Sequence, residues 1–459
     1  MKKGNIVKGK VIDINFGDRG IASFTAEDGN EYKVAISGAL IGSENEILIT
    51  KKKHDRYEGR VINKLVKSED EIESLCPHFP TCGGCTYQNL KYEKELEMKY
   101  NQVKNIMLWN RVDIPEEKWE GIQASPDEYA YRNKMEFSFG NEVKDGPITL
   151  GMHKKGSMHD IVPVTSCNIV DTDFTDILKY TLNYAKDKNL SFYHKMSHEG
   201  FLRHLVIRKG INTNDILVNI VTTSTKEDDL TDFLEGLKNL KLKGTLKTVM
   251  HTVNDKVSDI VVAESTKLLY GEEFITDELL GLKFKISPFS FFQTNTHGAE
   301  KLYSIVREYV GDAKGKTVFD LYCGTGTIGM IASKEASKVI GVEIIKEAVD
   351  MANENRKLNN IDNAEFIAGD VKEVIKNLDT NPDIIILDPP RDGIHKDAIK
   401  DVIDFNAKEI VYVSCNPKSL ARDLVILTEA GYDIKKIRCM DMFPHTHHVE
   451  TVCSLSKIK

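Results

Sequence analysis

Three side chains near the C-terminus combine a thiol and two carboxyl groups at positions typical of reactive groups. Cys415 directly follows the strand-like run EIVYVS, Asp388 ends the similar run DIIILD, and Glu450 closes the segment FPHTHHVE. A thiolate can add to an electron-poor carbon, and a nearby carboxylate can accept a proton in the same reaction. Most buried cysteines are inert apolar residues, which fits Cys439 and Cys453. We therefore select Cys415 as a candidate nucleophile and Glu450 as a candidate base.

The segment 443–450 also holds rival candidates for the base. They are His445, His447 and His448. Histidines grouped with a carboxylate occur at metal sites as well, but we favour a polar loop beside Glu450.

A glycine-rich turn follows the strand-like run TVFDLY and predicts a cofactor site. In the segment 320–329, Gly324, Gly326 and Gly329 match the pattern G-x-G-x-x-G, which also occurs in nicotinamide dinucleotide sites. Glu343 ends the next run, KVIGVE, where a carboxylate can bind ribose hydroxyls. Asp320 would crowd a pyrophosphate but suits a cationic sulfonium ligand. Together with the acid-Pro-Pro motif at 388–390, this favours S-adenosylmethionine over NAD.

These residues lie in a region of regular strand–helix alternation that starts near residue 316. The strand-like runs are TVFDLY, KVIGVE, AEFIAG, DIIILD and EIVYVS, each followed by a helical stretch. Such alternation predicts a Rossmann-like α/β domain with a doubly wound sheet, whose ligands bind at the carboxyl ends of the strands.

The preceding sequence predicts two further domains, so the expected fold class is multidomain. Residues 5–50 alternate short β-rich runs with glycine turns, as in an OB-like barrel, a common oligonucleotide binder. Residues 87–109 have apolar residues at helical spacing, and 130–270 mix strand-like runs with a helix near 171–188, as in an α+β domain. We place the domains at 1–62, 63–280 and 281–459, and allow the helix 87–109 to pack on the last of them.

Composition excludes a membrane protein and says little about nucleic acid. The chain has 459 residues and a formal net charge of −8, which argues weakly against binding of nucleic acid. The charge is uneven, however, because residues 1–67 hold 13 Lys or Arg against 9 Asp or Glu. Such a positively charged segment can mark a nucleic-acid-binding domain. No apolar run approaches the ~20 residues of a membrane helix. We expect a cytoplasmic protein without a membrane segment and without an obligate protein partner.

Four cysteines form a second group with chemical potential. Cys76, Cys82 and Cys85 lie within ten residues, and Cys167 in TSCNIV can supply a fourth thiolate. Four thiolates suit tetrahedral zinc or an iron–sulfur cluster equally well on spacing alone.

At these residues the chain resembles the RNA uracil-5 methyltransferase family that acts on ribosomal and transfer RNA. The resemblance rests on SPFSFFQTN (287–295), DLYCGTGTIG (320–329), DPPRDG (388–393), SCNP (414–417) and FPHTHHVE (443–450). It implies Cys415 as nucleophile and Glu450 as proton acceptor. It also implies cofactor contacts from Gln293, Tyr322, Glu343 and Asp388.

Uracil methylation explains why these groups are needed together. Carbon 5 of uracil is a poor nucleophile, and a thiolate that adds to carbon 6 converts the ring into an enolate that can accept a methyl group. A base then removes the proton from carbon 5. Asp388 can accept from N3–H of the uracil, and Arg391 can stabilise the enolate oxygen. Asp388 thus has two candidate partners, the cofactor and the uracil.

The first 60 residues resemble the TRAM module, an RNA-binding barrel that in this family belongs mainly to ribosomal-RNA enzymes. This resemblance favours 23S ribosomal RNA as the substrate. Similarity of CPHFPTCGGC (76–85) and the distant Cys167 to the cluster-bearing ribosomal branch implies a [4Fe–4S] cluster. We expect a structural role for it, because uracil methylation requires no electron, while redox sensing stays open.

Three alternatives remain open. The first is a uridine-5 methyltransferase of the transfer-RNA T-loop. The second is a non-catalytic RNA-binding iron–sulfur protein that senses redox state. The third is an amino-methylating enzyme that uses DPPR as a hydrogen-bond clamp.

RNA contacts are expected from two basic segments. A target uridine must be splayed out of folded RNA before Cys415 can reach it. Arg132 in YRNK (131–134) and the pair Arg203-His204 resemble family segments near the active-site mouth, although solvated surface charge is an equally good interpretation. The basic stretch at 51–60 can track phosphates.

Overall fold

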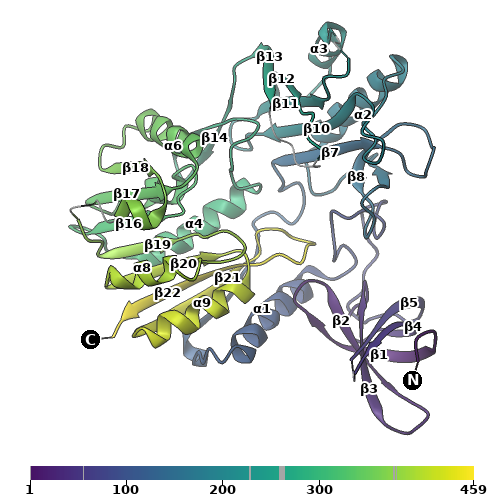
Figure 1. The fold of residues 1–459 in the computed structure, drawn as a ribbon, viewed down its shortest axis with the longest axis horizontal. Helices are drawn as coiled ribbons and strands as arrows, with labels where there is room; N and C mark the ends of the chain where they lie inside the picture. The colour runs from purple at the N-terminus through teal and green to yellow at the C-terminus, as the bar shows by residue number, and fades with distance from the viewer. Residues whose placement is uncertain are drawn as a thin grey trace.

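The computed structural model describes residues 2–54, 56–226, 229–257, 264–375, 378 and 380–458. Figure 1 shows three lobes: an N-terminal barrel, a central sheet with its helices, and a C-terminal sheet covered by helices. The N-terminus lies in the barrel, and the C-terminus lies at the far end of the C-terminal sheet.

The N-terminal lobe is a closed barrel of five strands in the order β1-β2-β3-β5-β4, which confirms the predicted β-barrel. Alternate residues of each strand point inward and form a small core that includes Val11, Phe24 and Ile47. A Cβ on Gly59 would lie 2.4 Å from the Ile47 side chain, so glycine lets β5 approach β4 closely. The strands are β1 (Ile6–Asn15), β2 (Arg19–Thr25), β3 (Glu31–Ser37), β4 (Glu44–Lys53) and β5 (Arg56–Val66).

The central lobe is a seven-stranded sheet in the order β13-β12-β11-β10-β7-β8-β9. Helices α2 (Thr172–Asp187) and α3 (Thr231–Lys238) pack on it through a core that includes Phe174 and Phe233. The Asp171 side chain caps α2 by accepting from the backbone N–H of Asp173. The strands are β7 (Lys134–Gly140), β8 (Thr149–His153), β9 (Ile161–Pro163), β10 (Leu202–Lys209), β11 (Asp215–Thr222), β12 (Thr245–Val253) and β13 (Ser265–Gly271).

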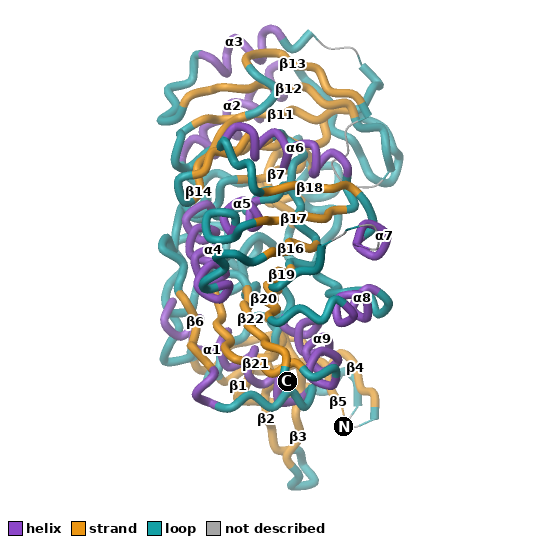
Figure 2. The backbone as a smooth tube through the Cα atoms, turned by 90° about the vertical axis from the view of Figure 1, so that its left-hand side faces the viewer, coloured by secondary structure: helices purple, strands orange, loops and turns teal. Residues whose placement is uncertain are grey.

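The C-terminal lobe is an eight-stranded sheet in the order β18-β17-β16-β19-β20-β22-β21-β6, and Figure 2 shows these strands stacked along one side of the molecule. Neighbouring strands in the run β18-β17-β16-β19-β20 are parallel, whereas β22 runs antiparallel to both β20 and β21. This arrangement confirms the predicted α/β domain. The strands are β16 (Thr317–Leu321), β17 (Lys338–Glu343), β18 (Ala364–Ala368), β19 (Ile384–Leu387), β20 (Glu409–Ser414), β21 (Tyr432–Met440) and β22 (Glu450–Lys457).

Helices cover both faces of this sheet and create two cores. Along β16, Val318 packs into one core and Phe319 into the other, because successive side chains of a strand point to opposite faces. The first core includes residues of α4 and α6, and the second includes residues of α1, α8 and α9. The helices are α4 (Thr296–Val310), α5 (Thr327–Ala332), α6 (Lys346–Leu358), α7 (Val371–Ile375), α8 (Ala398–Asp404) and α9 (Pro417–Glu429).

Two elements that precede the central sheet in sequence join the C-terminal lobe. Helix α1 (Tyr92–Trp109) starts five residues later than the expected 87 and packs against α9. After a 3-10 turn, η1 (Glu116–Lys118), strand β6 (Trp119–Gln123) pairs in parallel with β21 at the sheet edge. A separate hairpin, β14 (Ile275–Leu279) with β15 (Leu282–Ile286), leads into α4.

Helix α1 buries charge as well as apolar residues. Val103 and Met107 of the expected apolar stripe are buried, and so are Glu95 and Lys99. Lys99 Nζ lies 2.7 Å from Glu95 Oε1 and 2.8 Å from Asp441 Oδ1, and all three side chains are inaccessible to solvent. This buried ion triad joins α1 to the loop between β21 and β22. None of the helices that the structure describes is long and apolar enough to cross a membrane.

Candidate active site

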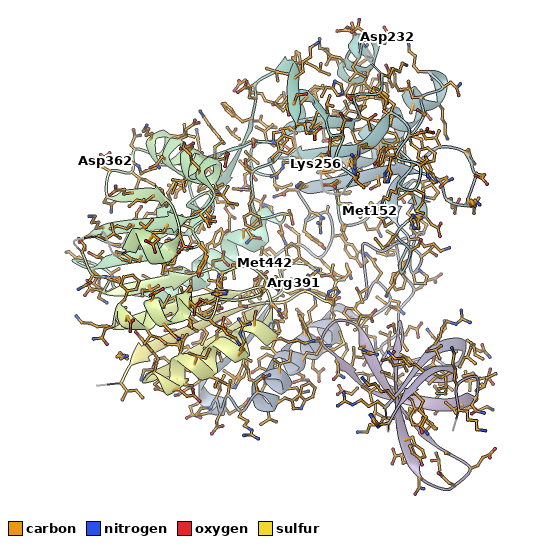
Figure 3. The ribbon with its side chains drawn as sticks, in the orientation of Figure 1. Met152, Asp232, Lys256, Asp362, Arg391 and Met442 are labelled. Atoms are coloured by element: carbon orange, nitrogen blue, oxygen red, sulfur yellow. The ribbon has the colours of Figure 1, made fainter. Side chains whose placement is uncertain are left out.

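A cavity of about 690 Å³ opens where the parallel strands β16, β19 and β20 end. Ligands of doubly wound sheets bind at this edge. Figure 3 labels Arg391, one of the lining residues, on the side of the C-terminal sheet that faces the other two lobes. The sequence-predicted residues that line the cavity are Gln293, Tyr322, Glu343, Asp388, Arg391, Cys415 and Glu450.

The loop between β16 and α5 is a tight turn held by Glu343. Gly324 and Gly326 have φ of 53° and 75°, and a Cβ on Gly326 would lie 2.6 Å from the ring of Phe366, so glycine is required there. The backbone N–H of Gly324 donates to Glu343 Oε2 at 3.2 Å. Glu343 therefore holds the glycine loop while it lines the cavity.

Asp320 presents a buried carboxylate oxygen to this cavity. Its Oδ2 accepts from the backbone N–H of Gly329 at 2.8 Å, whereas Oδ1 has no hydrogen-bond partner among the described residues. Burial, followed by the nearby Asp388 carboxylate, raises the pKa of Asp320 to about 8. An unpaired buried carboxylate is costly, and a cationic ligand would remove that cost. The sulfonium and ammonium groups of S-adenosylmethionine fit this requirement.

Cys415 follows the last residue of β20 and precedes the N-cap of α9. The Asn416 side chain accepts from the backbone N–H of Lys418 and donates to the Arg391 carbonyl oxygen at 2.9 Å, which ties the cysteine loop to the DPPR loop. Burial, and then the carboxylates of Glu450 and Asp388, raise the pKa of Cys415 to about 11. The Arg391 guanidinium opposes this rise. The thiol is thus protonated at neutral pH.

Asp388 and Glu450 form a pair of carboxyl groups beside Cys415. Glu450 is the first residue of β22 and lies opposite Met440 in the β21–β22 ladder. Burial raises the pKa of Asp388 to about 7, and burial together with the Asp388 carboxylate raises the pKa of Glu450 to about 8. A carboxyl group with a pKa near neutral pH is well suited to general acid–base chemistry.

Contacts from the central lobe position the loop that carries Gln293. The Asn133 side chain donates to the Gln293 carbonyl oxygen at 2.9 Å and to Thr296 Oγ1 at 2.8 Å. Asn295 caps α4 and donates to the Met442 carbonyl oxygen at 2.8 Å. Spacing alone did not identify Gln293, because it precedes the strand–helix alternation. The SPFSFFQTN motif was the only signal for it.

A second pocket, of about 160 Å³, is lined by all four cysteines of the predicted cluster, Cys76, Cys82, Cys85 and Cys167. Burial raises the pKa of Cys85 to about 12 and that of Cys167 to about 11, and neighbouring thiols add to both shifts. Within the described ranges, no three His, Cys, Asp or Glu side chains stand ready to hold a metal ion. The donor set nevertheless fits a soft metal, because four thiols surround one small pocket.

Arg132 lies in the cysteine pocket and not in the larger cavity. Its guanidinium Nε donates to the Lys134 carbonyl oxygen at 3.1 Å, and its backbone pairs with Asn295 in an isolated bridge. The structure therefore places Arg132 between the cysteine pocket and the loop that carries Gln293.

Comparison with known proteins decides the family. The sequence profile of the tRNA (Uracil-5-)-methyltransferase family matches residues 91–458. The chain is 49% identical over 457 residues to an uncharacterized RNA methyltransferase of Clostridium tetani, covering 100% of this chain and 99% of the relative. The chain belongs to this uracil-5 methyltransferase family. The protein is therefore an RNA uracil-5 methyltransferase that uses S-adenosylmethionine.

Two further relatives of this methyltransferase family cover nearly the whole chain. An uncharacterized RNA methyltransferase of Caldanaerobacter subterraneus subsp. tengcongensis is 47% identical and covers 100% of both chains. The crystal structure of Pyrococcus abyssi tRNA (uracil-54, C5)-methyltransferase with S-adenosyl-L-homocysteine superposes with a TM-score of 0.74 at 28% identity. The match covers 97% of this chain and 100% of that one.

The sequence did not reveal the residues that hold the loop between β21 and β22 in this methyltransferase. Besides Lys99, the Glu95 carboxylate contacts the loop by accepting from the backbone N–H of His445 at 2.8 Å. The His445 carbonyl oxygen accepts from the backbone N–H groups of Thr86 and Tyr87, which directly follow Cys85. A Glu–Lys pair four residues apart on the helix was the available signal.

Proposed function

We propose that this enzyme methylates carbon 5 of a uridine in 23S ribosomal RNA through a covalent bond between Cys415 and carbon 6. The observation that carries the proposal is the meeting of Cys415, Asp388 and Glu450 in one cavity with the unpaired oxygen of Asp320. Among the residues that line this cavity, the Asp320 carboxyl group suits a cationic donor, and Cys415, Asp388 and Glu450 suit a pyrimidine.

In the proposed reaction, the Cys415 thiol releases its proton to solvent, and the resulting thiolate adds to carbon 6, which leaves an enolate with a nucleophilic carbon 5. Bound S-adenosylmethionine supplies an electrophilic methyl group. Glu450 then takes the proton from carbon 5, the bond between sulfur and carbon 6 breaks, and the double bond between carbons 5 and 6 reforms. The cysteine leaves as a thiolate and takes up a proton from solvent, so the thiol is restored at the end of the cycle.

Arg391 and Asp388 assist the proposed reaction. The Arg391 guanidinium favours the thiolate of Cys415 and can stabilise the enolate oxygen of the ring. The Asp388 carboxylate acts electrostatically on Asp320 as well as on Glu450, which supports a role for it towards both the cofactor and the uracil. We assign it the uracil N3–H as well as a contact to the cofactor. Gln293, Tyr322 and Glu343 are assigned to the cofactor.

We also propose that Cys76, Cys82, Cys85 and Cys167 hold a [4Fe–4S] cluster with a structural role. Their shared pocket and the resemblance to the cluster-bearing ribosomal branch support this assignment. Uracil methylation needs no electron transfer. The cluster would join the irregular segment before α1 to the central sheet. Arg132, beside this pocket, is assigned to RNA binding.

Ribosomal RNA is favoured by the resemblance of the N-terminal barrel to the TRAM module. The competing substrate is transfer RNA, because the Pyrococcus abyssi enzyme acts on uracil-54 of tRNA. Because that match covers 97% of this chain, it includes most of the barrel. The barrel alone therefore does not distinguish ribosomal RNA from transfer RNA as the substrate. Family membership favours catalysis at uracil over the redox-sensor and amino-methylating alternatives.

Mapping of modified uridines tests the substrate assignment. We expect ribosomal RNA from a strain that lacks the gene to lose 5-methyluridine in the 23S molecule, as seen by mass spectrometry of nuclease fragments. Loss of 5-methyluridine from transfer RNA alone would contradict the ribosomal assignment and support the alternative.

RNA that contains 5-fluorouridine tests the chemistry independently. Fluorine cannot leave carbon 5 as a proton would, so a stable protein–RNA adduct should accumulate. Peptide mapping should place this adduct on Cys415. An enzyme that methylates normal RNA but forms no such adduct would contradict covalent catalysis.

A further inference from the structure

Four aromatic rings form a continuous row from the N-terminal barrel to the catalytic cavity. The ring centroids of Phe16 and His447 are 6.4 Å apart, those of His447 and His448 are 4.3 Å apart, and those of His448 and Phe443 are 6.0 Å apart. Such separations are typical of interacting rings. Phe443 lines the cavity that holds Cys415 and Glu450, so the row ends at the reaction site.

The barrel end of this row is held in place from two sides. Phe16 lies in the turn between β1 and β2, and Ile14, two residues earlier, accepts a hydrogen bond from the Gln102 side chain of α1 at 2.8 Å. On the other side of the turn, Asp18 forms an ion pair of 2.8 Å with Lys155. The turn therefore has contacts to α1 and to the central lobe, and it brings a barrel residue next to the catalytic loop.

Two exposed cations flank the row. Lys418, three residues after Cys415, places its Nζ 5.6 Å from the centroid of the Phe16 ring. Arg391 is exposed and lies close enough to His447 and His448 to lower the pKa of both, after the larger effect of burial. With the pKa of His448 lowered to about 3, that imidazole is neutral at physiological pH and offers an uncharged ring face.

We propose that Phe16, His447, His448 and Phe443, with Lys418 and Arg391, form a binding site for the unpaired nucleotides next to the target uridine. The six residues are called the stacking strip. Unstacked bases of RNA bind to aromatic rings, and adjacent cations bind the phosphates between them. When the target uridine enters the cavity, the neighbouring nucleotides stay bound to the stacking strip. This inference rests on the proposed RNA substrate but not on which RNA is methylated.

The competing explanation for Phe16 is simple packing. The ring is partly buried and packs against the second core of the C-terminal lobe. If packing were its only role, leucine would replace it adequately, and an aromatic substitute would have no advantage. If stacking is its role, tyrosine should replace it and leucine should not.

Binding and cross-linking with a short fluorescein-labelled oligouridylate test the site without requiring methyl transfer. We expect Phe16→Leu to raise the dissociation constant by about tenfold, the effect of one lost base–ring stack, and Phe16→Tyr to stay within about twofold of wild type. Tyr32→Leu, on β3 of the same barrel and outside the strip, is the matched aromatic control. Lys418→Ala should weaken binding, whereas Lys400→Ala on α8 should not.

Photo-cross-linking uses the unmodified protein and the same oligonucleotide substituted with 4-thiouridine. Cross-links in the peptides that contain Phe16 or residues 443–448 are expected. Their absence from both peptides, wild-type affinity in Phe16→Leu, or equal weakening by leucine and tyrosine would each overturn the proposal. Failure to methylate any RNA would instead count against the proposed function, because neither measurement here depends on turnover.

Discussion

The catalytic cavity and the cysteine pocket differ in what holds their reactive groups. Asp388 and Cys415 directly follow hydrogen-bonded strands, and Glu450 is itself a strand residue. The four cysteines of the other pocket lie in the segments 67–91 and 164–171, which are outside helices and named strands. The geometry of the cavity thus follows from the sheet, whereas the cysteine pocket depends on side-chain and loop contacts.

Because of this difference, we expect substitutions in the two regions to affect different properties, the reaction rate in one and the stability of the fold in the other. A change in the cavity should lower the rate and leave the fold intact, because the sheet does not depend on those side chains. A change in the cysteine pocket should lower stability, because little regular structure holds that segment. The buried triad of Glu95, Lys99 and Asp441 belongs to both regions, since α1 follows the cysteine segment and Asp441 begins the catalytic loop.

The largest effect on the rate is expected from Cys415→Ala. Without the sulfur, carbon 5 is not activated, and methyl transfer should fall by at least about 10⁴-fold. Cofactor binding and the melting temperature should stay close to wild type. As a control, Cys453→Ala, in the buried part of β22, should lower the melting temperature and spare the rate. Normal turnover by Cys415→Ala would contradict the mechanism.

A smaller loss is expected from Glu450→Gln, about 10²- to 10⁴-fold for removal of a general base. Because burial raises the pKa of Glu450 to about 8, the carboxyl group is protonated at lower pH and can accept a proton only as pH rises. The wild-type rate should therefore show an inflection near pH 8, below the further rise that ionisation of Cys415 causes at higher pH, and the inflection near 8 should disappear in Glu450→Gln. The exposed Glu429→Gln should keep it; an unchanged inflection in Glu450→Gln would identify another base.

For the cysteine pocket, Cys82→Ser should remove the proposed cluster and destabilise the protein. Loss of a resident metal group belongs to the few changes that cost more than about 4 kcal/mol. Iron and sulfide analysis of the purified protein, together with its melting temperature, measures both effects. Ser166→Ala, which alters the same pocket without removing a thiol, should keep the iron. A protein that contains no iron before substitution would refute the cluster.

The triad links the two regions, and Lys99→Met should cost about 3–5 kcal/mol because it leaves two carboxyl groups buried without their cation. Denaturant unfolding measures this loss. Lys94→Met removes an exposed pair with Glu97 from the same helix and should leave the free energy of unfolding close to that of wild type. Equal effects of the two substitutions would show that the triad contributes little.

The sequence alone predicted the elements whose signals are local. Strand–helix alternation located the sheet, and the residues that follow its strands, such as Asp388 and Cys415, were predicted to share one edge of it. This worked because the carboxyl ends of parallel strands meet at one edge of a sheet. The barrel was likewise predicted from short β-rich runs separated by turns.

Only the tertiary structure decided which distant segments meet. It placed β6 beside β21, Arg132 in the cysteine pocket, and Phe16 next to His447. It also showed that α1 buries Glu95 and Lys99, which a pattern of apolar spacing cannot reveal because their partner Asp441 lies far along the chain. Periodicity reports the environment of neighbouring residues, whereas such pairings depend on surfaces that exist only after the three lobes have packed together.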